Sequence, residues 1–141
     1  MSVFTAAELA YLGQGHLGRL ATLGPDGNPH VVPVGVFYDA EGDVLAVGGR
    51  GFASSRKFRD ARRDPRVAVV IDDAEMRPTR APNEGVRLRM LEVRGRAEVI
   101  SSGGSALRAG FDEPYIRIHP QRIVAMGLDH DDRVGRGRDI G

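Results

Sequence analysis

The 141-residue sequence contains no cysteine and no tryptophan, and only one of its 20 basic residues is a lysine. Without cysteine the chain can form neither a disulfide framework nor a thiolate nucleophile. Its sequence has no run of the roughly 18 apolar residues that a membrane span needs, and its N-terminus lacks the charged and apolar regions of a secretory signal. We therefore expect a soluble, cytoplasmic protein with no membrane partner.

The composition also argues against nucleic-acid binding and against a metal site. The formal net charge is only +1, so the molecule has no strong overall field to recruit polyanions. Aromatic residues make up 6% of the chain, which argues against stacking on nucleic-acid bases. The four histidines show no metal-ligand spacing. We predict neither a nucleic-acid partner nor a metal site.

A chain of this length corresponds to one compact domain. We assign that domain to residues 1–128 and expect the charged, glycine-rich segment 129–141 to form a mobile C-terminal tail unless a partner orders it. Near the N-terminus, Thr5 and Glu8 have the spacing of a capping box, which predicts a short helix that ends before Gly13.

Most of the remaining chain has the apolar pattern and the β-branched residues of strands. We expect strands at residues 18–23, 30–38, 44–47, 67–71 and 86–100, with a last pair at 115–119 and 122–128 separated by Pro120. The first three should form a meander whose first turn is rich in glycine and proline. With one basic helix inserted after the third strand, the pattern favours a small, mainly β antiparallel barrel of about six strands in the α+β class.

Two interruptions of the strand pattern carry predictions of their own. Gly95, inside the longest strand, predicts a bulge or a bend. Residues 72–85 contain two prolines and mixed charge, so we interpret them as a loop. The adjacent acids Asp72 and Asp73 could in principle serve acid-base chemistry, but they are more typical of a turn at the end of a strand.

The sequence Ser55-Arg56-Lys57 contains the single lysine and is the strongest candidate for a binding site. A hydroxyl, a guanidinium and an ammonium in succession suit an anion such as a phosphate. Ser54 or Ser55 should cap a helix that ends before Pro65, and a helix start offers free backbone N–H groups and the positive end of its dipole.

A simpler interpretation of this segment stays open. Five of the eight residues from Arg56 to Arg63 are basic, and such a run is usually a solvated helix face, or sometimes a nucleic-acid patch. The preceding glycines, Gly48, Gly49 and Gly51, could cradle a phosphate, but this signal is weak without the downstream triplet.

Several short motifs occur in an order that resembles a known family. They are Gly18-Arg19-Leu20-Ala21-Thr22, Pro25-Asp26-Gly27, Pro29-His30-Val31-Val32-Pro33-Val34, Ser55-Arg56-Lys57, Arg62-Arg63-Asp64-Pro65-Arg66 and Arg94-Gly95-Arg96-Ala97. In this order the chain resembles, from about Gly18 to Leu128, the split-barrel flavin-binding family typified by pyridoxamine 5'-phosphate oxidase. Within that family it is most similar to the actinobacterial branch that uses the deazaflavin coenzyme F-420.

The resemblance implies a fold, a cofactor and an activity. The implied fold is a six-stranded antiparallel split β-barrel, mainly β, with a short N-terminal helix and one inserted basic helix. The implied activity is that of an F-420-dependent reductase, which transfers a hydride between the reduced deazaflavin and a small conjugated organic acceptor. An FMN-dependent oxidase or reductase on the same barrel is the alternative, and a non-catalytic flavin or deazaflavin carrier is another. The family also implies a homodimer with the cofactor at the subunit interface.

The resemblance also implies particular site residues. Ser55, Arg56 and Lys57 would hold the cofactor phosphate, while the strand Val31, Val32, Pro33 and Val34 and the residues Val47, Gly48 and Gly49 would lie along the ring system. Met126 stands where a tryptophan is frequent in the family. It can still pack against the ring through its thioether, but the width and polarity of the pocket do not carry over from the resemblance. We name no catalytic residue, because His30, Tyr38 and His119 are each as well explained by packing or surface roles as by proton donation.

Overall fold

A computed structural model of the chain describes residues 1–76, 85–129 and 134–141. Its helical elements are α1 (Ala6–Leu12), the short 3₁₀ helix η1 (Phe52–Ser54), α2 (Arg56–Arg63) and α3 (Gly104–Leu107). Its strands are β1 (Leu17–Leu23), β2 (Pro29–Gly35), β3 (Phe37–Asp39), β4 (Val44–Val47), β5 (Arg66–Met76), β6 (Val86–Ile100), β7 (Tyr115–Met126) and β8 (Arg136–Asp139).

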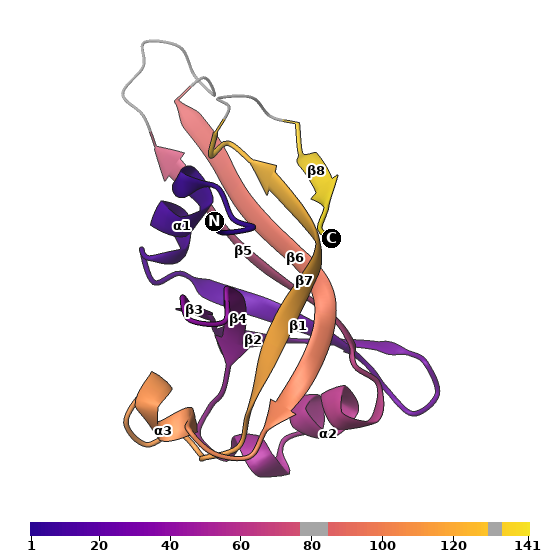
Figure 1. Ribbon diagram of the computed structural model, residues 1–141. Helices are drawn as coiled ribbons and strands as arrows, with labels where there is room; N and C mark the ends of the chain where they lie inside the picture. The colour runs from indigo at the N-terminus through magenta and orange to yellow at the C-terminus, as the bar shows by residue number, and fades with distance from the viewer. Residues whose placement is uncertain (77–84, 130–133) are drawn as a thin grey trace.

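The strands form one antiparallel sheet that curves into a half-barrel (Figure 1). Its order is β2-β1-β5-β6-β7-β4-β3, and β8 pairs with β7 outside this path. Because β2 and β3 stand at opposite ends of the order yet are joined through Val36 alone, the two edges of the sheet must come close together. This curvature is consistent with the predicted split barrel. The described residues contain eight strands, however, rather than six.

The β1–β2 hairpin confirms the first predicted turn. Gly24 donates its N–H to the carbonyl of Asn28, and Gly27, whose φ is +80°, donates to the carbonyl of Gly24. Glycine adopts this left-handed conformation without the steric cost that a Cβ would add. Asp26 stabilises the turn further by accepting hydrogen bonds from the backbone and side-chain amides of Asn28.

The core lies inside the curved sheet and is built from alternate residues of its strands. Fully buried members include Leu20, Leu91, Val93, Ile116, Ile118 and Ile123. In Figure 1, α1 and α2 lie toward opposite ends of the sheet. The predicted capping box of α1 is confirmed, since Thr5 accepts from the N–H of Glu8 while Glu8 accepts from the N–H of Thr5.

Two expectations for the first strands, one boundary and one arrangement, were wrong. The strand expected at 30–38 divides at Val36 into β2, which pairs with β1, and β3, which pairs with β4. No three-stranded meander forms, because the β1–β2 and β3–β4 hairpins lie at opposite ends of the sheet order and β4 pairs on its other side with the distant β7. Because of this division, one continuous segment forms both edge strands of the sheet. The division follows from the curvature of the barrel, which a local apolar pattern cannot predict.

The loop expected at 72–85 was wrong in its described part. Residues 72–76 extend β5 and pair with the start of β6, while residues 77–84 lie outside the described part of the chain. Asp72 and Asp73 consequently project to opposite faces of a strand and do not form a turn. Asp72 accepts a hydrogen bond from Arg19 at 2.7 Å, whereas Asp73 accepts from the Tyr11 hydroxyl at 2.9 Å and from Arg89.

The bulge predicted at Gly95 is confirmed. The β6–β7 register shifts between Arg94 and Gly95, so that Gly95 lies opposite Pro120 and Arg94 opposite Arg122. Proline cannot donate to a sheet ladder and is tolerated at such a bulge. The predicted break at Pro120 was therefore wrong, because β7 passes through it as one strand.

The segment expected to be a mobile tail contains β8, which pairs with residues 122–125 of β7. A partly buried ion pair joins this strand to α1. Arg138 donates from Nη1 and Nη2 to the carboxylate of Glu8 at 2.8 and 2.6 Å, and also to the carbonyl of Val3 at 2.7 Å. Glu8 is fully buried, so the C-terminal segment supplies the counter-charge that its carboxylate requires.

Candidate functional site

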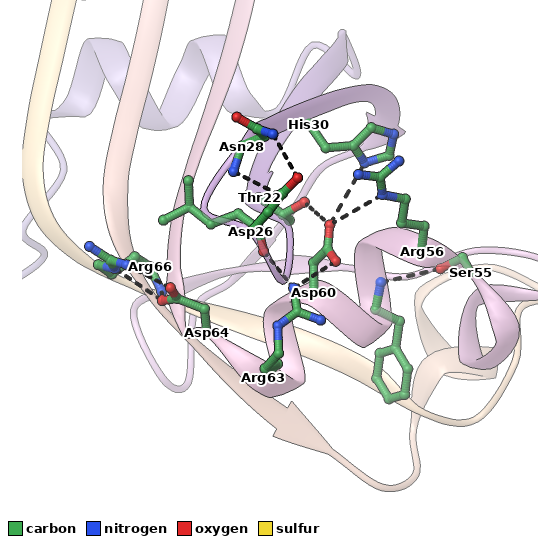
Figure 2. A network of polar contacts seen from close by, with 12 residues as sticks. Thr22, Asp26, Asn28, His30, Ser55, Arg56, Asp60, Arg63, Asp64 and Arg66 are labelled. Carbon is green, nitrogen blue, oxygen red and sulfur yellow. Dashed lines mark hydrogen bonds and ion pairs between the residues drawn. The ribbon is translucent and has the colours of Figure 1, made fainter.

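The predicted anion-binding triplet lies at the N-terminus of α2, where Figure 2 shows Ser55 and Arg56. Ser55 is the N-cap, as expected, and its Oγ accepts a hydrogen bond from the N–H of Phe58 at 3.3 Å. The same hydroxyl donates its single proton to the carbonyl of Phe52 at 2.6 Å. Ser55 thus holds the start of the helix in place, and its proton is already committed within the protein.

Arg56 points from α2 toward the β1–β2 hairpin, where Figure 2 shows it beside His30 and Asp60. Its Nε lies 3.8 Å from Oδ2 of Asp60, one helical turn away. A Cβ placed on Gly24 would lie 3.4 Å from Nη2 of Arg56, so the small residue at this turn leaves room for the guanidinium. About half of the Arg56 side chain remains exposed, which leaves donors available to a ligand.

Asp60 is the centre of a polar network that the sequence analysis did not single out. Its carboxylate is 2% exposed and accepts hydrogen bonds from Thr22 on β1 and from Arg63 on α2, each at 3.0 Å. Burial opposes ionisation of this group, but the hydrogen bonds from Arg63 and Thr22 outweigh it and hold the pKa of Asp60 below its usual range. The ionised carboxylate therefore fixes α2, with Arg56, against the hairpin.

A sequence signal for this network did exist. Asp60 lies four residues after Arg56 and three before Arg63, the spacings at which charged side chains meet on a helix. The contribution of Thr22 could not be found in this way, because it comes from a strand 38 residues earlier in the chain.

Lys57 has different surroundings from Arg56. Its ammonium lies 5.6 Å from the centroid of the buried Phe52 ring, a cation–π contact. Within the described residues it forms no hydrogen bond or ion pair. Consecutive helical residues point in directions about 100° apart, so Arg56 and Lys57 leave the helix start on different sides. The single lysine is therefore a cation without a carboxylate partner in the described part of the protein.

The glycine-rich loop before α2 already binds a carboxylate. Gly51, with φ of +64°, and Ala53 each donate a backbone N–H to the carboxylate of Asp112 at 3.0 Å. A phosphate cradle at this loop would depend on backbone N–H groups of this kind. Of the three glycines considered for a phosphate cradle, Gly51 therefore has its N–H already engaged by Asp112, while the start of α2 is unaffected.

The residues expected along the ring system have unequal access. Gly48 is packed, since a Cβ there would lie 3.3 Å from Phe111 and 3.4 Å from Leu107. Val47 is fully buried, so only its backbone could reach a ligand. Gly49 has more room, because a Cβ there would make only ordinary contact with Phe52 at 3.7 Å.

The four residues expected on β2 lie on two faces of the sheet. Val31 and Pro33 are exposed on the outer face, Val31 by 64%, whereas Val32 and Val34 face the core. Among the described strands β2 pairs only with β1. Its other edge therefore presents backbone N–H and C=O groups that could contact a flat ring.

Met126 is not brought to the triplet within one chain. It lies opposite Met90 at one end of β6, whereas the C-terminal side of α2 meets β6 near Ala97, whose N–H donates to the carbonyl of Pro65. Seven residues of strand separate these positions by about 20 Å. Met126 instead lines an outer-face cavity of about 450 Å³ together with Val70, Met90 and the ion-paired Arg89.

The three ambiguous proton donors have the following neighbours. Tyr38 donates its hydroxyl proton to Asp43 at 2.7 Å, and Nε2 of His119 lies 2.9 Å from Glu98 on the exposed surface. His30 differs, because its Nδ1 is buried 4.0 Å from Asp60 and has no hydrogen-bond partner. Of the three, His30 alone lies beside the candidate anion site.

Neither a metal site nor a membrane-spanning helix is found among the described residues. They contain no group of three or more histidine, aspartate or glutamate side chains arranged to hold a metal ion. In the same part of the chain, every helix is too short or too polar to cross a bilayer.

Comparison with known proteins identifies the family. The family model for pyridoxamine 5'-phosphate oxidase matches residues 4–129. A 5a,11a-dehydrotetracycline/5a,11a-dehydrooxytetracycline reductase of Streptomyces rimosus is 40% identical over 138 residues, which cover 97% of this chain and 93% of the reductase. That relative agrees with the resemblance to the actinobacterial branch.

Solved structures share the fold at lower identity. A conserved hypothetical protein of Mycobacterium tuberculosis has a TM-score of 0.63 at 24% identity, covering 95% of this chain and 94% of its own. An FAD binding protein of Mycobacterium smegmatis has a TM-score of 0.61 at 19% identity, covering 99% of this chain and all of its own. By its sequence match over residues 4–129, the chain belongs to the pyridoxamine 5'-phosphate oxidase family.

Proposed function

We propose that this protein is an oxidoreductase that uses coenzyme F-420 to reduce a small conjugated organic acceptor, with FMN as the alternative cofactor. The observation that carries the proposal is Lys57, a cation at the start of α2 with no carboxylate partner among the described residues. A relative named as a reductase, 40% identical over almost the whole chain, supports the reductive direction. A neighbouring fold named as an FAD binding protein supports a flavin-type cofactor.

The donors at the start of α2 fit the phosphate that FMN and F-420 share. The ammonium of Lys57 and the exposed half of Arg56 supply positive charge, and the first backbone N–H groups of the helix supply further donors. Ser55 contributes by capping the helix, since its proton is donated to Phe52. Asp60 contributes by holding Arg56 against the hairpin.

The deazaflavin, when bound, supplies the hydride, so the task of the chain is to position and to shield. We assign the ring system to the open edge and exposed face of β2, around Val31 and Pro33, and to the backbone of Val47, Gly48 and Gly49. His30, beside Asp60, stays a candidate for hydrogen bonding and not a named proton donor.

A homodimer would complete this site. Met126, Val31 and Pro33 all lie on the outer face of the sheet, as successive strand pairs from β2 to β7 show. That face also carries Leu17 and Leu88, which are 66% and 46% exposed. Apolar side chains gathered on one sheet face favour burial against a partner. A second copy seated there could bring its Met126 toward the first copy's β2, which one chain cannot do.

The homodimer predicts a defined change of mass on mutation. Val70 lies near the middle of the outer face, opposite Arg19 on one side and Glu92 on the other. We expect sedimentation velocity to find the wild type at the mass of two chains and Val70→Lys at the mass of one, because an ammonium placed in the apolar interface would lose its hydration. Glu41→Lys, in the exposed turn after β3, should leave the dimer intact. A monomeric wild type would contradict the proposal.

A binding titration separates the two cofactors. We expect the purified protein to bind F-420 with micromolar affinity and FMN more weakly, measured side by side by fluorescence. Tighter binding of FMN would assign the protein to the FMN-dependent alternative. Binding of neither cofactor would overturn the proposal, and an oligonucleotide titrated at two salt concentrations tests whether α2 instead recognises nucleic acid, since such binding weakens steeply with salt.

A further inference from the structure

A cavity of about 350 Å³ lies on the side of the molecule where α1, β3 and α3 follow one another in Figure 1. The end of α1, the junction between β2 and β3, and the residue after α3 line it. Its volume is in the range of small-molecule sites. The side chains of Leu9, Leu12 and Leu17 make it apolar on one side, and those of Phe37 and Tyr38 add aromatic surface.

The only arginine among the lining residues is Arg108, in the segment after α3. Its guanidinium carbon lies 5.5 Å from the ring centroid of Phe37 and 5.7 Å from that of Phe111, and the two rings meet edge to face at 6.0 Å. Within the described residues Arg108 has no hydrogen bond or ion pair. A guanidinium held by ring contacts alone keeps its N–H donors available.

The charge of the cavity is therefore one-sided. Its described lining includes no aspartate or glutamate, and its titratable side chains are those of Arg108, His16 and Tyr38. The Tyr38 hydroxyl already donates its proton to Asp43, so Tyr38 contributes mainly its aromatic ring to the cavity. Aromatic and leucine surface with one available cation suits a flat, conjugated molecule that carries one negative charge.

The cavity also lies next to the end of β2, the strand that we assign to the cofactor ring. Gly35, Val36 and Phe37 line it, and they directly follow Val34 in the chain. At about 3.3 Å per residue, the two regions are within roughly 10 Å of each other. A molecule in the cavity would thus lie next to the proposed ring site.

We propose that this cavity is the acceptor site, that it takes a planar conjugated or aromatic compound bearing one carboxylate or ionised enol, and that Arg108 pairs with that anion. This inference rests on the proposed reductase function, but the binding that it predicts can be measured on the protein without its cofactor. The competing explanation is that Arg108 only clamps Phe37 against Phe111.

Equilibrium dialysis of the cofactor-free protein tests the site with two matched probes, 2-naphthoate and the uncharged 2-naphthamide. We expect the wild type to prefer naphthoate about tenfold, the lower end for a hydrogen bond to a charged group. Arg108→Gln should abolish this preference without changing naphthamide binding, and Arg108→Lys should retain part of it. Arg122→Gln, which removes an exposed arginine paired with Asp139, should bind both probes like the wild type.

Each outcome decides the inference. If Arg108→Gln keeps the preference for naphthoate, or if the wild type binds neither probe or both equally, the acceptor site is not here. A thermal melting curve for Arg108→Gln identifies a purely structural role, which would lower the melting temperature and weaken both probes alike. Normal F-420 binding with no naphthoate preference overturns only this inference, whereas a naphthoate preference without binding of either cofactor overturns only the proposed reductase.

Discussion

We expect Lys57→Ala to weaken the proposed binding of F-420 by about 10- to 150-fold, the loss that follows when a hydrogen bond to a charged phosphate is removed. The ammonium has no carboxylate partner among the described residues, so its removal uncovers no buried acid. Its stabilising contact with the Phe52 ring is modest, and the fold should therefore survive. The measurement is a fluorescence titration of the cofactor against the wild type and the variant at one salt concentration.

A matched control separates this local contact from the general charge of the helix. Arg62→Ala removes the same charge from an exposed position on α2, where the side chain lies over the Phe58 ring. We expect Arg62→Ala to change the affinity less than about twofold, since exposed charges at a distance are screened by salt. Equal losses in the two variants would show that α2 attracts the cofactor only through its overall charge, and an unchanged affinity in Lys57→Ala would remove the triplet from the site.

We expect Gly95→Ala to destabilise the protein by about 3 kcal/mol and to lower the melting temperature by roughly 10 °C. A Cβ on Gly95 would lie 2.1 Å from the carbonyl oxygen of His119 on the neighbouring strand. The obstacle is backbone, so it cannot be relieved by a side-chain rotation. The β6–β7 pair must then open at the bulge that bends the sheet. Urea unfolding followed by circular dichroism measures the change.

Gly13→Ala provides the control for Gly95→Ala. Gly13 ends α1 with φ of −69° and ψ of −11°, and a Cβ there would make only ordinary contacts of 3.5 Å. The free energy of unfolding should therefore stay within about 0.5 kcal/mol of the wild type, or rise slightly. If Gly95→Ala were as stable as Gly13→Ala, the close approach of β6 and β7 at the bulge would be wrong.

The candidate site shows how local signals succeed and where they end. The cap by Ser55, the end of α2 before Pro65 and the bulge at Gly95 follow from a few neighbouring residues, and each was predicted. The Asp112 carboxylate at the loop before α2 was not, because it comes from a segment about 60 residues later. Such a contact leaves no mark in the periodicity of either segment.

The C-terminal segment illustrates the same limit on a larger scale. Charge and glycine content at 129–141 predicted a mobile tail, and these properties are indeed unfavourable for an isolated strand. β8 forms nevertheless, because β7 offers a free edge and because Arg138 meets the buried Glu8. Neither partner is visible from the composition of the tail.

The sequence by itself determined the family, the mainly β class, the positions of most strands, the helix caps and the placement of Ser55, Arg56 and Lys57 at a helix start. These features depend on interactions between residues a few positions apart, which a pattern can record. Only the tertiary structure decided which strands pair, that Asp60 holds Arg56, that Met126 lies far from α2 within one chain, and that Arg108 meets Phe37. Those features depend on the curvature of the sheet, which brings together residues that no local spacing relates.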